Sequence, residues 1–423
     1  MIFLSLSFAA LLLLGMPIFI AMAGAAIAVI ATGDFSLGIV AQRISAGVQS
    51  FPLLAVLLFT LAGALMNESG ISDRLFALTR AFVGHIRGGL AQSVVISNVF
   101  LAGISGSSVA DCAASSRIFV PQLTKAGCGQ GFAAALCASS SSLGPIIPPS
   151  ILMVIYAWQA NTSLGDLFWA GVIPGLLIAS SLMVVVALVA ARRNFPKDGG
   201  LSRARLWVAF KDAFWALMMP VLILGGFRAG LFTATEIAGV AAAYAFIIGV
   251  FVYRSLSFRM LPKVLRTTAM ETAVILAIVA AASPFSWILA VEQAPQLLVE
   301  TIKQVTASPW ALLLMLNLAL LLLGMIMESI AIMIILVPIL LPVLATFGID
   351  LTHFGIVLLI NLVIGQLTPP VGVLLFVAGS VSRTKVSDIV REMRPFYVAL
   401  IAALALVTYV PALSLWLPGL LHG

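Results

Sequence analysis

Two short segments combine glycine and paired prolines inside long apolar stretches. Residues 141–150 read Ser-Ser-Leu-Gly-Pro-Ile-Ile-Pro-Pro-Ser, and residues 362–371 read Leu-Val-Ile-Gly-Gln-Leu-Thr-Pro-Pro-Val. A Pro pair removes two backbone donors and strains the preceding turn, so each helix is expected to unwind there. The unwound ends expose carbonyl oxygens on one side and amides on the other, which suit a cation and an anion respectively. Both segments therefore predict backbone ion sites.

Hydroxyl and amide side chains surround both predicted breaks and two nearby small-residue turns. Such oxygens are ligands of the hard type that Na⁺ prefers, by analogy with other hard cations. The predicted sodium- and substrate-binding residues are Ser105, Ser107, Ser108, Ser140, Ser141, Gly144, Pro145, Glu328, Ser329, Asn361, Gly365, Gln366, Thr368 and Pro369. Alternatively, the serines only permit close helix packing, and Glu328 only caps the next helix.

The composition is that of an integral membrane protein. Of 423 residues, 62% are hydrophobic and 9% are charged. The net charge of +7 does not indicate nucleic acid binding, because 14 of the 22 Lys and Arg residues fall in three loops (192–211, 254–266 and 383–394) between apolar stretches. The positive-inside rule places these loops in the cytoplasm. The first apolar stretch, 3–31, is too long for a signal-peptide core and predicts an uncleaved span.

The two halves of the chain repeat each other at an offset of 221 residues. Ten residues match between Gly103 and Ala157 without a gap: Gly103/Gly324, Ser108/Ser329, Ala110/Ala331, Pro121/Pro342, Leu123/Leu344, Gly127/Gly348, Gly144/Gly365, Pro148/Pro369, Pro149/Pro370 and Ala157/Ala378. Chance matching between apolar segments would not readily align the Gly, the Pro pair and the turns in one register. We infer an internal duplication.

Each repeat is predicted to contain two spans, an interfacial arm, a helical hairpin, a broken helix and a last span. In the first repeat (1–191) these are spans within 3–67, arm 71–87, hairpin 88–125, broken helix 131–158 and span 167–191. A basic loop and a linking span at 213–228 occupy 192–230. In the second repeat (231–423) they are spans within 231–291, arm 292–307, hairpin 309–347, broken helix 354–381 and span 395–418.

The hairpin helices, at about 15 residues, are too short to cross a 30 Å hydrocarbon layer comfortably. They predict re-entrant hairpins that enter and leave on one side. Each repeat then crosses the membrane four times, and the single linking span inverts the second repeat relative to the first. The predicted fold is an all-α polytopic membrane protein with two inverted repeats, an arrangement typical of secondary transporters.

The sequence lacks the motifs that an enzyme function would require. The chain has no nucleotide-binding Gly-rich loop ending in Lys-Ser/Thr, and His85, His353 and His422 are scattered. An intramembrane protease would need a second Asp at the depth of Asp111, and the sequence offers none. Arg117 follows Asp111 by six residues and so lies on a different face of the helix, which makes a direct ion pair unfavourable. Two half-helix sites that face opposite sides suit an alternating-access transporter better than a channel. Cys112, Cys128 and Cys137 form neither a disulfide framework nor a metal-binding spacing, and predict small buried side chains.

Several motifs resemble one transporter family. They are Ser-Gly-Ser-Ser-Val-Ala-Asp at 105–111, Pro-Gln-Leu-Thr-Lys-Ala-Gly at 121–127, Gly-Pro-Ile-Ile-Pro-Pro-Ser at 144–150, Gly-Ile-Asp at 348–350 and Leu-Thr-Pro-Pro-Val-Gly at 367–372. They resemble the large membrane subunit of tripartite ATP-independent periplasmic (TRAP) transporters. The sequence departs from the family at Ser108, at Ser115-Ser116-Arg117 and at Cys128, which leaves Arg117 without an inferred role.

The resemblance implies a function beyond what the residues give. Such subunits sit in the bacterial inner membrane, with a separate small four-helix membrane subunit and a periplasmic binding protein. They import organic acids of the C4-dicarboxylate, keto acid or sialic acid type, driven by Na⁺ and without another cofactor. Hairpins and broken helices move as an elevator against the other spans. A stand-alone divalent-anion/sodium symporter of related architecture is the alternative.

Overall fold

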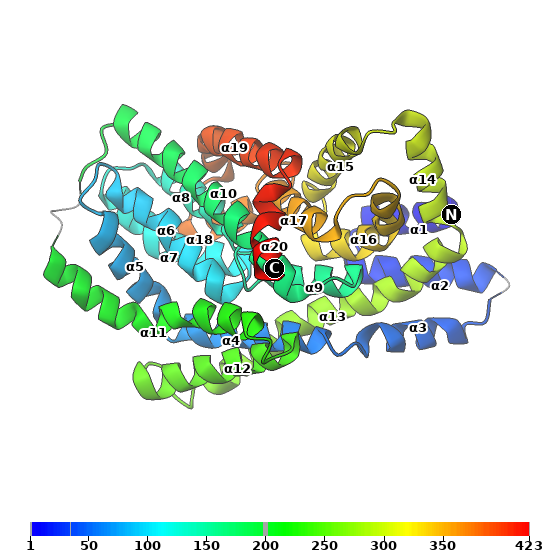
Figure 1. Cartoon of the computed structure of the whole chain (residues 1–423), viewed down its shortest axis with the longest axis horizontal. Helices are drawn as coiled ribbons and strands as arrows, with labels where there is room; N and C mark the ends of the chain where they lie inside the picture. Colours follow the sequence, from blue (N-terminus) through cyan, green and yellow to red (C-terminus); the bar gives the residue numbers. More distant parts are fainter. Residues whose placement is uncertain (1, 34, 198–201, 423) are drawn as a thin grey trace.

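The computed structural model describes residues 2–33, 35–197 and 202–422 of the chain (Figure 1). Within these residues the chain forms α-helices, one 3₁₀ turn, one π-helical turn and no strand, which confirms the predicted all-α class. Part of the predicted basic linking loop, residues 198–201, lies outside the described residues.

The helices follow the same order in both halves. The first half contains α1 (Ile2–Leu13), α2 (Ile18–Thr32), α3 (Gly38–Val48), α4 (Leu53–Glu68), α5 (Ile71–Val83), α6 (Gly89–Ser105), α7 (Ser108–Lys125), α8 (Gln130–Ser140), α9 (Ile151–Ala160) and α10 (Leu164–Arg192). The linking helix is α11 (Arg203–Arg228). The second half contains α12 (Ala234–Ile247), α13 (Leu261–Val291), α14 (Ala294–Val305), α15 (Pro309–Gly324), α16 (Ser329–Thr346), α17 (Leu351–Gln366), α18 (Val373–Ser382), α19 (Val386–Tyr409) and α20 (Ala412–His422).

The duplication is visible in the helix boundaries. Adding 221 to the bounds of α7 gives the bounds of α16, Ser329–Thr346, without a shift. The arm helices α5 and α14 and the half-helices α9 and α18 correspond within one to two residues. The same order of hairpin, broken helix and span therefore positions the site twice.

The prediction of one span over 3–31 is wrong. Two short helices, α1 and α2, replace it and pack against each other. The chain turns between them because Gly15 takes a left-handed conformation, with φ at +78°, and Pro17 fixes the entry to α2. At 12 residues, α1 is too short to cross a bilayer alone.

Three other predicted spans also differ from the observed helices. The helix α4 is preceded by an unpredicted helix, α3, and the two meet at an angle of 52°. The predicted last span, 395–418, is split into α19 and α20, which are bent by 55° at Val410 and Pro411, where proline lacks the amide that would continue the helix. The linking helix α11 begins ten residues before the predicted 213.

The broken helices form the centre of the molecule. Every residue from Phe132 to Ile146 and from His353 to Leu367 is buried, and in Figure 1 helix α17 lies between α10 and α15. The chain between α8 and α9 contains a 3₁₀ turn at Ser141–Leu143 and then irregular backbone up to Ser150. These two helices are thus separated at the predicted place.

The second break is shorter than the first and begins later than predicted. The helix α17 continues through Gly365 to Gln366, and α18 begins at Val373. The difference has a simple cause in the aligned repeats, where Gln366 occupies the position of Pro145. Glutamine keeps the backbone amide that proline lacks, so α17 extends until the Pro369–Pro370 pair ends it.

By length and composition, five of the described helices could cross a membrane, or up to eight spans if each of three bent pairs counts as one. The hairpin helices α6, α7, α15 and α16 contain 17, 18, 16 and 18 residues. They are therefore about 24–27 Å long, slightly longer than predicted. Their re-entrance and the inversion of the second repeat remain predictions.

Candidate functional site

Polar contacts close the tip of the first hairpin. Helix α6 ends at Ser105, Gly106 is left-handed with φ at +62°, and Ser107 is the N-cap of α7. The Ser107 hydroxyl accepts a 3.4 Å hydrogen bond from the Ala110 amide. Ser105 Oγ donates a 2.5 Å hydrogen bond to Asp111 Oδ1. The turn therefore holds a buried acid beside two serines.

The first break lies directly against this tip. A Cβ atom at Gly144 would lie 2.9 Å from Asp111 Oδ2 and 2.9 Å from the Ser108 amide nitrogen. A Cβ atom at Gly106 would lie 2.7 Å from the Pro149 carbonyl oxygen. Glycine at both places permits a backbone approach that a larger residue would prevent. The tip of the first hairpin thus contacts the break of its own half.

The second hairpin contacts its own break in a related way. A Cβ atom at Gly365 would lie 2.5 Å from the Gly324 Cα atom, so two backbones touch there. The Val371 amide, inside the break, donates a 3.2 Å hydrogen bond to the Met325 carbonyl at the tip. Glu328 is the N-cap of α16, and its Oε2 atom accepts hydrogen bonds of 2.8 and 3.2 Å from the amides two and three residues on.

A single side chain joins the two hairpins. Ser108 Oγ donates a 2.8 Å hydrogen bond to Gln366 Oε1, and Gln366 Nε2 donates a 2.8 Å hydrogen bond to Ser329 Oγ. All three side chains are buried. Because Ser108 and Ser329 are equivalent residues of the two repeats, Gln366 lies between matching points of the two tips.

Four of the predicted site residues bond within their own helical segments; Ser140 and Asn361 also bond other helices, whereas the other two have only these local bonds among the described residues. The Ser141 hydroxyl donates a 2.8 Å hydrogen bond to the carbonyl three residues earlier, and the Thr368 hydroxyl donates one of 2.7 Å to the carbonyl four residues earlier. Such bonds satisfy a buried hydroxyl locally. They favour the alternative that these two residues support the helix ends.

Two more predicted residues connect a broken helix to the first helix of its hairpin. Asn98 Nδ2 donates a 2.9 Å hydrogen bond to Ser140 Oγ, and Asn361 Nδ2 donates a 2.7 Å hydrogen bond to Asn317 Oδ1. Asn361 Oδ1 is buried and has no hydrogen-bond partner in the part of the chain that the structure describes. The two halves therefore use a similar polar contact at equivalent positions, because Ser140 and Asn361 match at the offset of 221 residues.

Asp111 lies at the site but was not among the site residues predicted from the sequence. Its side chain is 1% exposed, and its Oδ2 atom has no hydrogen-bond partner among the described residues. Within the same part of the chain, Ser142 Oγ, in the first break, is also buried without a hydrogen-bond partner. Arg117 is exposed and is not the partner of Asp111 in any ion pair among the described residues. The position of Asp111 in the first turn after a Ser-rich tip was the available signal.

The three cysteines are buried and free, as predicted. Cys128 lies in the loop between α7 and α8, outside the membrane-spanning helices, and burial raises the pKa of its thiol to about 11. The thiol therefore stays protonated at neutral pH and packs as a small apolar side chain.

Comparison with known proteins identifies the family. The sequence profile of the "Tripartite ATP-independent periplasmic transporter, DctM component" matches residues 5–413. The chain belongs to this family. It is 39% identical over 414 residues to the sialic acid TRAP transporter large permease protein SiaM of Vibrio cholerae, covering 98% of this chain and 97% of that protein. It is 41% identical over 371 residues to the C4-dicarboxylate TRAP transporter large permease protein DctM of Pseudomonas aeruginosa, covering 88% and 87%.

The fold is similar to that of a solved transporter. The crystal structure of the Alcanivorax borkumensis YdaH transporter superposes with a TM-score of 0.66 at 16% identity, covering 98% of this chain and 99% of that one. TRAP large permease subunits work with a small membrane subunit and a periplasmic binding protein, and are not enzymes. The chain is therefore a bacterial membrane transport subunit.

Proposed function

We propose that this chain is the sodium-coupled transport subunit of a TRAP importer of small organic acids. The observation that supports this most strongly is the unpaired Oδ2 atom of Asp111, buried where the first hairpin tip meets the first break. An uncompensated buried carboxylate costs on the order of several kcal/mol. A bound cation removes that cost.

Oxygen-bearing groups lie beside Asp111 and in the adjoining break, which favours a hard cation. The Ser105 hydroxyl bonds Oδ1, and the position of a Cβ atom on Gly144 lies 2.9 Å from Oδ2. In the 3₁₀ turn that precedes Gly144, the Ser142 hydroxyl is buried without a hydrogen-bond partner among the described residues. Carboxylate, hydroxyl and carbonyl oxygens are the ligands that hard cations prefer. Na⁺ is the coupling ion that this environment suits.

A second sodium site is proposed at the equivalent contact in the other half, between Gly365 and the tip that carries Glu328 and Ser329. The two sites differ in their acids. Position 332, which is equivalent to Asp111, is Ile332, and Glu328 caps α16 through Oε2. We therefore expect the Asp111 site to bind Na⁺ more tightly than the second site.

The substrate carboxylate is proposed to bind between the tips, near Ser108, Gln366 and Ser329. Hydroxyl and amide donors at this point match an organic acid, and the two reported relatives transport sialic acid and C4-dicarboxylates. A keto acid is equally compatible with these donors. Because Gln366 joins both tips, we expect hairpins and broken helices to move together, as an elevator against the remaining helices of the inner membrane.

Transport by the complete system tests this proposal. The chain, its small four-helix partner and its periplasmic binding protein are reconstituted in vesicles, and uptake of a labelled acid is measured under an inward Na⁺ or K⁺ gradient. We expect uptake only with Na⁺ and the binding protein, and loss of uptake in Asp111→Asn but not in the control Asp73→Asn, which alters an exposed acid of α5. Uptake with K⁺ alone would reject sodium coupling, and uptake without the binding protein would favour the stand-alone symporter.

A further inference from the structure

An acidic residue that takes no part in the proposed transport site, Glu271, lies on the surface of a long apolar helix. The helix α13 (Leu261–Val291) has 31 residues and is long and apolar enough to cross a membrane. Because α13 begins at Leu261, Glu271 lies ten residues inside it, about 15 Å along the helix axis. Its side chain is exposed. A carboxylate in a membrane-spanning helix is costly unless it is paired.

Landmarks on α13 indicate that Glu271 lies within the hydrocarbon layer. Near the far end of the helix, the Arg43 guanidinium lies 5.4 Å from the ring centroid of Trp287, and tryptophan is typical of a membrane interface. Glu271 precedes Trp287 by 16 residues, about 24 Å along the axis, which is less than the 30 Å thickness of the layer. A tilt of the helix would place the carboxylate deeper still.

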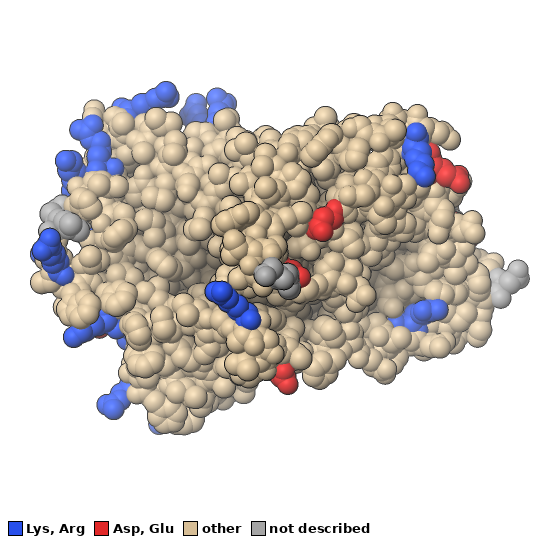
Figure 2. Space-filling view, in the orientation of Figure 1, with Lys and Arg blue, Asp and Glu red and all other residues tan. Residues whose placement is uncertain are grey.

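The other end of α13 carries the basic residues expected at the cytoplasmic side. Lys263, in the first turn of α13, forms a 2.9 Å ion pair with Glu68 at the end of α4. Figure 2 shows Lys and Arg gathered mostly at one end of the molecule. Glu271 lies two helical turns beyond Lys263, away from these cations.

Glu271 forms neither a hydrogen bond nor an ion pair with the residues that the structure describes. The neighbouring positions Thr268 and Thr272 face the interior, where α13 packs against α2, α3, α4 and α16. The chain therefore leaves this charge without compensation. A group that donates hydrogen bonds, and above all a cation, is the complementary partner.

The exposed residues around Glu271 form a continuous helix face. Thr267, Met270 and Val274 lie four residues before, one residue before and three residues after Glu271, and all three are exposed. Met270 is 63% and Val274 is 52% exposed. Residues at these spacings share one side of a helix, so a second helix could lie along them. An acyl chain would cover the apolar residues but could not pair with the acid.

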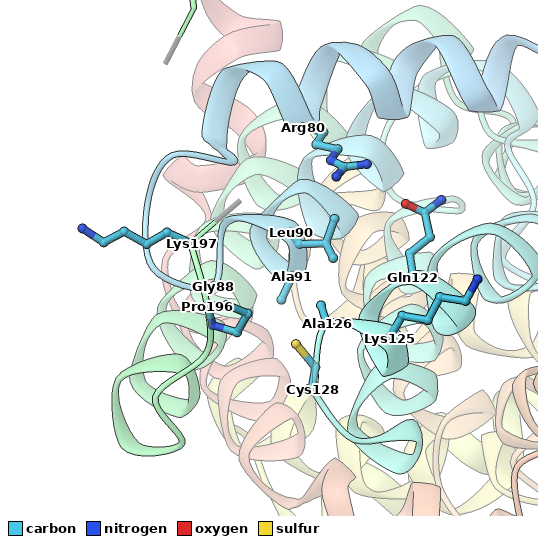
Figure 3. A pocket seen from close by; sticks show the side chains of 10 residues that line it. All are labelled: Arg80, Gly88, Leu90, Ala91, Gln122, Lys125, Ala126, Cys128, Pro196 and Lys197. Carbon is cyan, nitrogen blue, oxygen red and sulfur yellow. The ribbon is translucent and has the colours of Figure 1, made fainter. Parts of the chain in front are cut away.

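A cavity at the cytoplasmic end is a less suitable place for a permanent partner. Its volume is about 430 Å³, and its lining includes Leu90 and Ala91 of α6 and Gln122 and Lys125 of α7. Figure 3 shows these side chains around the cavity, with Lys197 pointing away from it. This lining belongs largely to the first hairpin, which moves in the proposed function. The helix α13 belongs to the part that stays in place.

We propose that the α13 face around Glu271 is the docking surface for a helix of the small membrane subunit, which presents a Lys or Arg side chain to Glu271. This inference rests on the proposed function for the existence of a separate small subunit. Opposite charges attract strongly within the layer because water does not screen them. Apolar side chains of the docked helix cover Met270 and Val274. A two-fold contact of α13 with a second copy would instead bring two acids together.

Retention of the small subunit during purification tests the assignment. The tagged large subunit is purified with its small subunit in mild detergent, and native mass spectrometry measures how much small subunit remains bound. We expect Glu271→Gln to weaken the association about ten-fold, equivalent to about 1.4 kcal/mol, the order of one hydrogen bond between membrane helices. The control Glu300→Gln, an exposed acid of α14, should retain the small subunit as the wild type does. The melting temperature of the large subunit alone should not fall in either variant.

A charge exchange identifies the partner residue. In the Glu271→Lys background, each Lys and Arg within the spans of the small subunit is changed to Glu in turn, and one exchange should restore retention. Equal retention by the wild type and Glu271→Gln would overturn this inference while leaving sodium-coupled transport intact. Loss of self-association of the large subunit in Glu271→Gln, with the small subunit retained, would also overturn it. Failure of the wild type to retain any small subunit would contradict the three-part system as well.

Discussion

Ser108 and Gln366 lie 258 residues apart in the chain, yet the Ser108 hydroxyl donates a 2.8 Å hydrogen bond to the Gln366 side chain. Ser108 begins the second helix of the first hairpin, and Gln366 ends α17 in the second half. Through its amide nitrogen Gln366 also bonds Ser329 at the second tip. The tips of the two hairpins are therefore joined by a buried amide.

Removing this amide should separate the two tips. Gln366→Ala leaves the buried hydroxyls of Ser108 and Ser329 without their partner, and we expect a loss of about 1–3 kcal/mol in the free energy of unfolding. Uptake should fall with it, because the proposed joint movement of the two tips depends on this amide. Thermal denaturation and vesicle uptake measure the two effects. Thr124→Val is the control, since its exposed hydroxyl bonds only a carbonyl of its own helix. Unchanged stability and uptake in Gln366→Ala would contradict the joining role.

The close contact of Gly365 with Gly324 should not tolerate a side chain. In Gly365→Ala, the new methyl group would meet backbone atoms at 2.5–2.6 Å, so the hairpin tip must move away from the break. We expect a destabilisation of about 1–3 kcal/mol, typical of overpacking. Gly225→Ala in α11 is the matched control, because a Cβ there meets nothing within 4 Å. Denaturation midpoints of equal value for the two variants would argue against the contact.

We expect Ser107 to stabilise the protein mainly as the N-cap of α7. Its hydroxyl accepts a hydrogen bond from the Ala110 amide at the start of α7. Ser107→Ala should therefore lower the free energy of unfolding by about 1 kcal/mol, and Ser107→Asn, which retains capping ability, should restore most of it. Thermal melts of the three proteins in the absence of Na⁺ make the comparison. A loss in Ser107→Ala that Asn fails to restore would assign the hydroxyl another role.

The sequence predicted the helix breaks well because proline acts locally. A Pro pair ends a helix in almost any surroundings, so the separation of α8 from α9 and of α17 from α18 followed from the residues alone. The later start of the second break was also encoded locally, since Gln366 replaces Pro145. The turn between α1 and α2 was missed because Gly15 and Pro17 lie in an apolar stretch of span length.

The contacts between distant segments were harder to predict. The sequence suggested Ser108, Gln366 and Ser329 as site residues, but nothing in their local pattern indicated that one amide would bond both serines. Asp111 was set aside because it lacked a charged partner nearby in the sequence. That lack of a partner became meaningful only when the fold placed the carboxylate against Gly144, away from solvent. Tertiary packing supplies this information.

Direct measurement of sodium binding tests whether Asp111 forms part of a sodium site. Calorimetric titration of the purified protein with NaCl, at constant ionic strength maintained with KCl, is compared for the wild type, Asp111→Asn and Asp73→Asn. We predict saturable binding in the wild type and in Asp73→Asn, and loss of the tighter binding event in Asp111→Asn. The neutral variant should also melt at a higher temperature without Na⁺, because it buries no uncompensated charge. Undiminished Na⁺ binding by Asp111→Asn would contradict the central claim.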